Sequence, residues 1–387
     1  MRAGGGFQIL AIHEGAEFMP RNKTVLISTI EADFHSHCVA MAIEAMGHHA
    51  TLWYSAELGT GIQASIRHPG GDSGRGVTTF TDDCDSLPDK PDTIWMRRPQ
   101  QPVVKGVHED DREFARIEAR DFDRNIWAMI GREALWVNEP DAARRSNNKA
   151  VQLQAAHRLG IQTPETLFSN HPRDIRDFIS DQGGRVIFKT YHPGFWSDGS
   201  IRAAAFSARV TADSLPGDHL LQASPGIFQQ EIAKDFEVRV NCLGDTVIPV
   251  RLNSQGGSLT EVDWRVDPQG VPTQPIRLPK TVEKQCRDLM RALGLAYGAM
   301  DWIVTPEGDY VFLEVNEQGQ CLWVEESCSD IPMLQCLSEY LVFGEVRSDP
   351  QAPPNEFRVA DFCEGVTKRI KTEKQLSGDD RMESGTA

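Results

Sequence analysis

The chain has 387 residues, a length that suits two or three domains of ordinary size. Its composition, 40% hydrophobic and 25% charged, is that of a globular protein and excludes a disordered, collagenous or coiled-coil chain. The 40 basic and 56 acidic residues give a formal net charge of -16. This argues against nucleic acid or an anionic membrane as a general partner, since both need a positive field on the protein.

The sequence contains no recognisable export or membrane signal. Its first residues lack the continuous apolar core of a secretory signal, and no apolar run approaches the roughly 18 residues of a membrane helix. The eight cysteines are scattered without a CxxC pair, which favours reduced thiols over disulfides or a zinc site. We therefore expect a cytoplasmic protein. Met19 directly precedes the first convincing strand, so Met1 and Met19 are both candidate translation starts.

An α/β domain is predicted over residues 21–140, after a flexible leader at 1–20. Its opening strand–helix–strand succession is typical of a βαβ unit, and Pro140 marks its end. The predicted order is strand 24–30, helix 34–46, strand 49–55, a glycine-rich loop at 59–76, strand 93–99, helix 110–130 and strand 134–140.

The second half of the chain has an α+β pattern, with antiparallel hairpins in place of repeated βαβ units. We expect a central unit at 141–228, a C-terminal unit at 229–345, and a flexible tail at 346–387 that lacks the apolar density of a core. The predicted elements are helix 148–159, strand 185–191, glycine loop 192–200, strand 226–232, hairpin 236–252, helix 281–293 and hairpin 299–316.

The last predicted hairpin carries the strongest chemical signal. If Thr305 faces Tyr310 across the turn, Asp301 lies directly opposite Glu314. Asn316 then lies on the same face, one step along its strand. Two opposed carboxylates repel each other unless a cation lies between them, and with an amide oxygen they suit Mg²⁺ shared with nucleotide phosphates. The alternative is an exposed hairpin whose acids face water, but the apolar residues on either side argue for burial.

A second signal is a lysine at the end of a buried strand. Lys189 ends the run VIFK, and the glycine loop with Ser197 and Gly199 follows at once. A buried lysine needs an anion, and such a loop can wrap backbone N–H groups around phosphate oxygens. The ordinary alternative is a strand-end lysine beside a surface loop. The loop is not a P-loop, because GxxxxGK[ST] is absent from the sequence.

A third signal is the stretch FQQEIAKDFEVRV at 228–240. Its strand ends in Gln230, Glu231 and Ile232 and then breaks, which is typical of a hinge whose backbone meets an adenine edge. Glu231 or Glu237 could then bind the ribose hydroxyls. An ordinary edge strand with polar outward positions is the alternative.

The face on which Arg251 lies depends on a turn. Arg251 shares a face with Glu237 and Arg239 if the turn before its strand has three residues, and lies on the opposite face if the turn has two. The sequence leaves both arrangements open.

Together these motifs resemble the ATP-grasp ligases. The resemblance covers about 147–326 and is carried by NNKAVQLQAAHRLGIQTPETLFSN, VIFKTY with its glycine loop, QQEIAKDFEVRV, and MDWIV followed by YVFLEVNEQGQCLWVE. It implies an α/β pre-ATP-grasp domain followed by two α+β lobes with the nucleotide between them, and ATP and Mg²⁺ as cofactors. The residues it implies are Lys149 and Lys189 for the phosphates, Gln230–Ile232 for adenine, Glu237, Ser197 and Gly199 for further nucleotide contacts, and Asp301, Glu314 and Asn316 for magnesium.

Three shorter stretches, TIWMRRP, VDWR and EVNEQGQCLWVE, resemble the microviridin-type peptide maturases, the graspetide synthetases. This implies that a ribosomal precursor peptide with a leader segment is macrocyclised. Asp or Glu side chains would be activated as acyl phosphates and joined to Thr, Ser or Lys side chains. The candidate catalytic residues are Lys189, Arg239 and Arg251, and the candidate substrate-binding residues are Arg97, Arg98 and Arg265. Each arginine could instead be solvated or salt-bridged. Cys321 departs from the bulky residue expected at its position.

Three other functions compete with macrocyclisation. One is a ligase that adds a free amino acid to a peptide or protein, similar to the glutamate ligases of the same superfamily. The second is a small-molecule dipeptide ligase. The third is a silent peptide-binding module, against which the intact Asp301, Glu314 and Asn316 argue. The resemblance is compatible with a homodimer. Since ATP and an acidic peptide are both anions, the net charge of -16 requires cations to be concentrated around one cleft.

Overall fold

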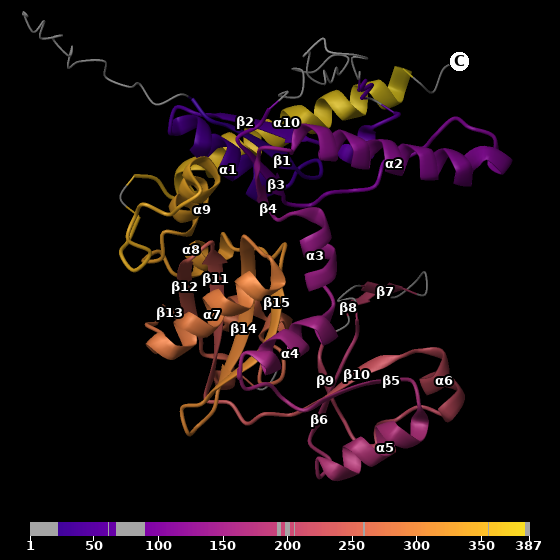
Figure 1. Ribbon diagram of the computed structural model, residues 1–387, viewed down its shortest axis with the longest axis vertical. Coiled ribbons are helices and arrows are strands. Elements are labelled where there is room, and N and C mark those ends of the chain that lie inside the picture. Colours follow the sequence, from indigo (N-terminus) through magenta and orange to yellow (C-terminus); the bar gives the residue numbers. More distant parts are fainter. Residues whose placement is uncertain are drawn as a thin grey trace, which may run out of the picture.

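The structure, a computed structural model, describes residues 22–60, 62–66, 90–191, 195–197, 202–204, 206–257, 260–354 and 356–383. They form two four-stranded sheets, a five-stranded sheet and a two-stranded sheet with their helices (Figure 1). The predicted leader at 1–20 and most of the loop at 59–76 lie outside the described residues. None of the helices in these ranges combines the length and apolarity needed to span a membrane.

The N-terminal sheet is parallel, with the strand order β2-β1-β3-β4, which confirms the predicted βαβ pattern. The Asp33 side chain caps α1 by accepting a hydrogen bond from the backbone N–H of Ser36 at 3.2 Å. Gly47 follows this helix with φ +82°. The elements are β1 Thr24–Ser28, α1 Phe34–Ala45, β2 His49–Trp53, η1 Ser55–Glu57, β3 Thr93–Met96, η2 Glu109–Asp111, α2 Arg112–Ile130 and β4 Leu135–Val137.

The central sheet is antiparallel, with the order β5-β10-β6-β9, and its strand β6 ends at Lys189. Two helices, α3 and α4, run to it from the N-terminal sheet (Figure 1). The elements are α3 Pro140–Ser146, α4 Lys149–Arg158, β5 Thr166–Ser169, α5 Pro172–Asp181, β6 Val186–Lys189, β7 Phe195–Ser197, β8 Arg202–Ala204, β9 Ala208–Val210, η3 Ala212–Ser214, α6 Asp218–Ala223 and β10 Gly226–Gln230.

The C-terminal sheet is antiparallel, with the order β13-β12-β11-β14-β15. Val238, Val240, Met300 and Trp302 lie in a core with residues of α7, so the alternate residues of β11 and β14 point to the opposite face. The elements are β11 Phe236–Leu243, β12 Thr246–Leu252, η4 Ser254–Gly256, η5 Trp264–Val266, η6 Pro268–Gly270, β13 Thr273–Pro275, α7 Lys280–Leu293, β14 Tyr297–Val304 and β15 Tyr310–Asn316.

The β14–β15 hairpin brings Asp301 opposite Glu314, as predicted, but by a different register. Val304, and not Thr305, pairs with Tyr310. A β-bulge beside Asp301 then inserts one residue, Leu313, into β15 and restores the predicted pairing. The bulge is therefore what aligns the two carboxylates.

The predicted flexible tail at 346–387 is wrong for its helical part. The C-terminal helices are α8 Trp323–Ser327, α9 Met333–Phe343 and α10 Val359–Glu383. Val359 and Val366 of α10 are buried, and Phe362 and Ile370 pack against the same core. These apolar residues recur every three or four positions, so one face of α10 packs beside α1 (Figure 1).

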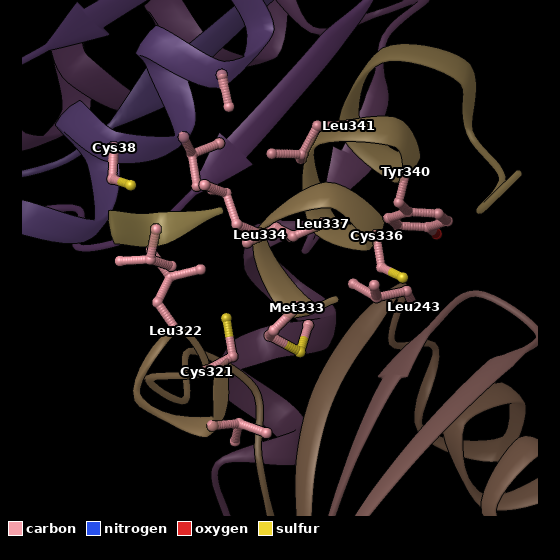
Figure 2. Close-up of a cluster of buried hydrophobic side chains, with 14 of the residues drawn as sticks. Cys38, Leu243, Cys321, Leu322, Met333, Leu334, Cys336, Leu337, Tyr340 and Leu341 are labelled. Atoms are coloured by element: carbon pink, nitrogen blue, oxygen red, sulfur yellow. The ribbon is translucent and has the colours of Figure 1, made fainter. Parts of the chain in front are cut away.

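The core around α10 joins elements that are far apart in the sequence, α1 on one side and α9 and α10 on the other. Figure 2 shows Cys38 of α1 close to Leu334, Leu337 and Leu341 of α9, and Cys321 lies in the same cluster. The cysteines that the structure describes are all free.

Candidate active site

Two pockets meet beside the β14–β15 hairpin. The smaller pocket lies between the central and C-terminal sheets and is lined by the hinge residues Gln230, Glu231 and Ile232. The larger one, about 560 Å³, extends to the N-terminal sheet and includes Arg97 and Arg98. The residues common to both linings are Lys189, Ser207, Arg265 and Glu314.

The two carboxylates at this junction each have a cationic partner. Asp301 lies 3.0 Å from the Nε atom of Arg239, and Glu314 forms an ion pair with Lys149. Arg265 lies further from Glu314, at 3.9 Å. These contacts confirm part of the expected concentration of cations around one cleft.

The two carboxyl groups differ in their proton affinity. Burial raises the pKa of Asp301 to about 6, and Glu314 adds to the rise while Arg239 opposes it. Burial alone would also raise the pKa of Glu314, but three nearby cations outweigh it and lower the pKa to about 2. These cations are Lys149, Lys189 and Arg265. Glu314 is therefore ionised at neutral pH.

The oxygen atoms at the junction fit a hard divalent cation. Asn316 is exposed at the end of β15, lines the larger pocket and follows Glu314 by two positions. Two carboxylates and an amide oxygen are donors that Mg²⁺ prefers. Over the described ranges, no three His, Cys, Asp or Glu side chains gather as metal ligands. The amide of Asn316 would add an oxygen donor to the two carboxylates.

Lys189 lies at the junction, half-buried, and donates a hydrogen bond to Oε1 of Gln229 at 2.7 Å. Burial lowers the pKa of its ammonium group, and the neighbouring cations Lys149 and Arg265 act in the same direction. Glu314 opposes this shift. An anion in the pocket would complete the charge balance of this lysine.

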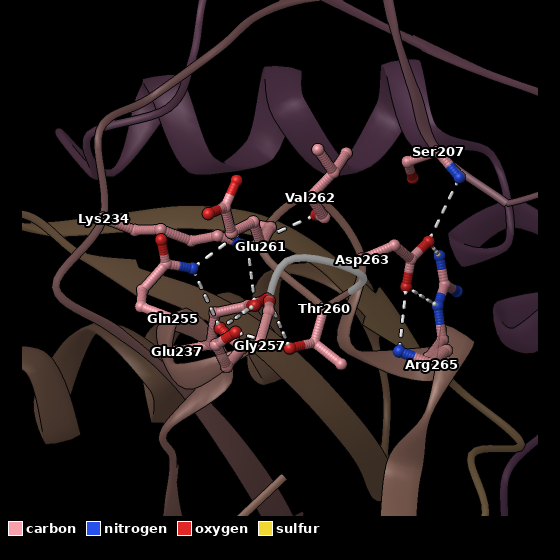
Figure 3. A network of polar contacts seen from close by, with 11 residues as sticks. Ser207, Lys234, Glu237, Gln255, Gly257, Thr260, Glu261, Val262, Asp263 and Arg265 are labelled. Atoms are coloured by element: carbon pink, nitrogen blue, oxygen red, sulfur yellow. Dashed lines mark hydrogen bonds and ion pairs between the residues drawn. The ribbon is translucent and has the colours of Figure 1, made fainter. Parts of the chain in front are cut away.

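The predicted ribose-binding acids both line the smaller pocket, and both are paired. Glu231 lies 2.7 Å from the Nε atom of Arg209. Glu237 lies 2.7 Å from Nζ of Lys234 and accepts a hydrogen bond from the hydroxyl of Ser254. Figure 3 shows the surrounding network, in which Lys234 also donates to the carbonyl of Val262.

Arg251 does not face the site, so its predicted catalytic role is wrong. The β11–β12 turn has two residues, Gly244 and Asp245, because Leu243 pairs with Thr246. Arg251 consequently pairs with Val238 and points to the face opposite Arg239. Its guanidinium carbon lies 3.7 Å from the centroid of the Phe236 ring.

The three candidate substrate arginines have different environments. Arg97 is 2% exposed, pairs with Asp33 at 3.2 Å and donates to the carbonyl of Gln318 at 3.1 Å, so it holds the site together rather than facing solvent. The Arg98 side chain is 38% exposed and lines the larger pocket. Arg265 is held by both carboxylate oxygens of Asp263, at 2.7 and 2.8 Å (Figure 3).

Arg239 is fixed by two tryptophans. Its guanidinium carbon lies 5.5 Å from the centroid of Trp264 and 6.0 Å from that of Trp323. The centroids of the two indole rings lie 5.0 Å apart, with the ring planes tilted by 36°. Their contact orients the cation toward Asp301.

Sequence reasoning missed two buried amides that support the hairpin. Gln152 hydrogen-bonds both the N–H and the C=O of Val315, between Glu314 and Asn316. The amide of Asn138 likewise accepts a hydrogen bond from the N–H of Tyr297 and donates one to the C=O of Tyr297. It also donates to the carbonyl of Glu317. The single available signal was that Gln152 follows Lys149 by three positions and so shares its helix face.

Two predicted nucleotide-binding residues belong to the glycine loop. Ser197 ends the short strand β7, and Gly199 lies outside the described residues. Their roles stay predictions.

Comparison with solved structures places the chain in a family, although no family model matches it. A RiPP-associated ATP-grasp ligase from Chryseobacterium gregarium, solved with ADP and a leader and core peptide, is 25% identical and aligns with a TM-score of 0.75 over 85% of this chain and 99% of that one. The macrocyclase MdnC from Microcystis aeruginosa MRC, solved with the precursor peptide MdnA, is 30% identical, with a TM-score of 0.70 over 82% of this chain and 99% of MdnC.

A curated relative matches a shorter stretch. A probable alpha-L-glutamate ligase 2 from Shewanella amazonensis is 27% identical over 208 residues, which is 53% of this chain and 66% of the ligase. The match thus spans just under two thirds of that relative, whereas MdnC is matched over nearly its whole length. The chain therefore belongs to the RiPP-associated ATP-grasp ligases.

Proposed function

We propose that the protein is an ATP-dependent ligase that macrocyclises a ribosomal precursor peptide. It joins Asp or Glu side chains of the peptide to Thr, Ser or Lys side chains of the same peptide, and releases ADP and phosphate. The observation that carries the proposal is that two adjoining pockets share Lys189 and Glu314, with Asp301 in the lining of the smaller pocket and Lys149 and Asn316 in that of the larger one. ADP and peptides in the related structures support the same assignment.

The smaller pocket takes the nucleoside, between the central and C-terminal lobes. Gln230, Glu231 and Ile232 line this pocket and are the candidates for adenine, and Glu237 of the same lining is a candidate acceptor for the ribose hydroxyls. The apolar side chains of Ile187 and Ile303 line the same pocket and suit the faces of a purine. The phosphates then extend to Lys189 and Lys149 at the junction.

Asp301, Glu314 and Asn316 would hold magnesium, which neutralises phosphate charge during phosphoryl transfer. Arg239 keeps Asp301 ionised for this task by opposing the effect of its burial. Lys149 forms an ion pair with Glu314, and it would be available to the phosphates if Glu314 held the cation. The lysines and arginines then stabilise the negative charge that moves to the acyl phosphate.

The larger pocket takes the peptide. Its basic residues Arg98 and Arg265 suit the side-chain carboxylate that is to be activated, and Arg97 holds the segment 317–320 that forms its floor. The acceptor hydroxyl or amine of the peptide attacks the activated carbonyl and displaces phosphate. The proposal includes a leader segment on the precursor peptide, a cytoplasmic location of the protein and a homodimer of this chain.

The test is mass spectrometry of the short peptide encoded beside the gene, after incubation with the protein, ATP and Mg²⁺. Macrocyclisation removes one water per bond formed. The matched pair of variants is Glu314→Gln at the junction and Glu307→Gln in the exposed turn of the same hairpin. Glu314→Gln should abolish ADP release without loss of the fold. Glu307→Gln should leave ADP release unchanged. Normal turnover in Glu314→Gln would overturn the proposed metal site.

Addition of a free amino acid is the second candidate, because the curated relative is a probable glutamate ligase. The same assay separates the two functions. A peptide that gains the mass of an amino-acid residue indicates addition, and a peptide that loses water indicates cyclisation. No ADP and no mass change with any acidic peptide would exclude both.

A further inference from the structure

Two exposed aromatic side chains lie in the larger pocket, whose lining is otherwise mostly polar. Tyr191 is 45% exposed and Phe206 is 39% exposed, and both line this pocket. Neither residue lines the smaller pocket, so they do not belong to the nucleoside site. Aromatic side chains in the lining of a pocket, together with a few charged groups, are typical of a ligand-binding site.

Both aromatic residues are held in place by neighbours of the site. The ring of Tyr191 lies 6.2 Å from that of Phe168, and Tyr191 follows Lys189 by two positions. Phe206 precedes Ser207, whose backbone N–H donates to Asp263 at 3.1 Å, and Asp263 in turn holds Arg265 (Figure 3). The apolar surface is thus tied to two of the basic residues at the junction.

The charge of the pocket limits what can occupy it. Arg98 and Arg265, which the proposed function leaves to the peptide, line the pocket together with the two aromatic rings, and Glu314 and Glu317 also line it. A small inorganic anion would satisfy the cations and leave the rings in water. A peptide segment that carries an acidic side chain and a bulky apolar one satisfies both parts of the lining.

We propose that Tyr191 and Phe206 form an apolar subsite that binds a bulky apolar side chain of the peptide substrate, in the same segment as the acidic residue to be activated. This inference rests on the proposed function, since it takes a peptide as the occupant of the larger pocket. It adds a sequence requirement: the acidic residue of a good substrate has an aromatic or large aliphatic residue nearby.

The expected effect follows from the exposed area. Aromatic side chains bury about 150–250 Å² in an interface, and somewhat less than half of each ring is exposed here. At about 25 cal/mol per Å², covering about half of the exposed area of the two rings corresponds to a change of roughly ten- to eightyfold in peptide affinity. Substitution of both rings by alanine should therefore weaken binding of a suitable peptide by at least about tenfold.

The experiment is a selection of random peptides of about twelve residues, displayed on mRNA, against the immobilised protein with ADP and Mg²⁺. The wild-type protein should enrich peptides in which an acidic residue has a bulky apolar neighbour. The double variant Tyr191→Ala/Phe206→Ala should enrich acidic peptides without that apolar preference. The control is Phe114→Ala, which removes a 68% exposed ring from α2, away from the pocket linings.

A double-mutant cycle then measures the contact directly. One enriched peptide and its copy with the apolar residue changed to alanine are titrated against the wild type and the double variant. Loss of at least about tenfold in the wild type, and less than twofold in the double variant, supports the subsite. An equal loss in both proteins, or an apolar preference that survives in the double variant, overturns it. Circular dichroism verifies that the double variant and the Phe114→Ala control are folded.

ADP release with the enriched peptides separates this inference from the proposed function. If water-loss products form but the double variant behaves as the wild type, the subsite is wrong and the ligase function stands. If the apolar preference depends on Tyr191 and Phe206 but no ADP is released, peptide binding stands and the proposed reaction fails.

Discussion

Gln152 is the residue whose substitution tests the architecture of the site most directly. Its side chain donates to the carbonyl of Val315 at 2.8 Å and accepts from the N–H of Val315 at 2.9 Å. It also donates to the carbonyl of Ser146 at 2.6 Å. Strand β15 lies at the edge of its sheet, so Gln152 takes the place of a neighbouring strand at this point. Glu314 and Asn316 flank the residue that it holds.

Gln152→Met keeps the shape of the side chain and removes all three hydrogen bonds. The N–H and C=O of Val315 then lose this partner in a site where Gln152 is 2% exposed. Each buried backbone group without a partner costs about 1–3 kcal/mol, so the free energy of unfolding should fall by about 2–6 kcal/mol. Since β15 also positions Glu314 and Asn316, kcat for ADP release should fall at least about tenfold.

The matched control is Gln154→Met on the same helix, because Gln154 is exposed. Urea denaturation followed by circular dichroism gives the free energy of unfolding, and a coupled assay gives ADP release. If Gln152→Met costs less than about 1 kcal/mol, or no more than Gln154→Met, then the amide does not satisfy Val315 and the reasoning is refuted.

Three further predictions concern residues away from this amide. Arg239→Met should lower kcat at least about tenfold while Arg251→Met changes it less than twofold, since they lie on opposite faces of the sheet; equal effects in the ADP assay would contradict the register. Burial raises the pKa of Asp123 to about 6, so its charged form is disfavoured above pH 6 and this penalty disappears as the pH falls through 6 toward 3.8. At about 1.4 kcal/mol per pKa unit, Asp123→Asn should stabilise the protein by at most about 3 kcal/mol at pH 7.5 and hardly at all at pH 4, and the same gain in urea at both pH values would disprove the assignment. Truncation after Glu356 removes the buried face of α10 and should lower the free energy of unfolding by at least about 5 kcal/mol. Truncation after Lys374 keeps that face and should leave the urea midpoint nearly unchanged. If the protein truncated after Glu356 is soluble and equally stable, α10 is dispensable.

The sequence was most informative where local pattern sets the geometry. The βαβ opening and the pairing of Asp301 with Glu314 both follow from periodicity within short segments. The pairing was nevertheless reached through a wrong register, because alternation does not reveal that a bulge at Leu313 adds one residue. For Arg251, a difference of one residue in the turn decides the face, and sequence pattern does not resolve turns to that precision.

Other features depend on contacts between distant parts of the chain. Arg97 was predicted to contact substrate, but Asp33 and the carbonyl of Gln318 already occupy its guanidinium. Gln152 and Asn138 belong to no motif, and their partners lie more than 150 positions away. The tail is a different case: Val359, Phe362, Val366 and Ile370 have helical spacing, so the amphipathic pattern was present in the sequence and was outweighed by the surrounding polar residues.

The shared core of α1, α9 and α10 also constrains synthesis of the protein. Val39 and Ile43 of α1 are covered by side chains such as Leu334 and Leu337, which the ribosome adds about 290 residues later. At about 5–20 residues per second, this delay is on the order of 15–60 s. Throughout that interval the nascent N-terminal sheet has one apolar helix face without its cover. Exposed apolar surface of this kind makes a nascent chain prone to aggregation, so the packing of α1 is completed only when the last helices emerge.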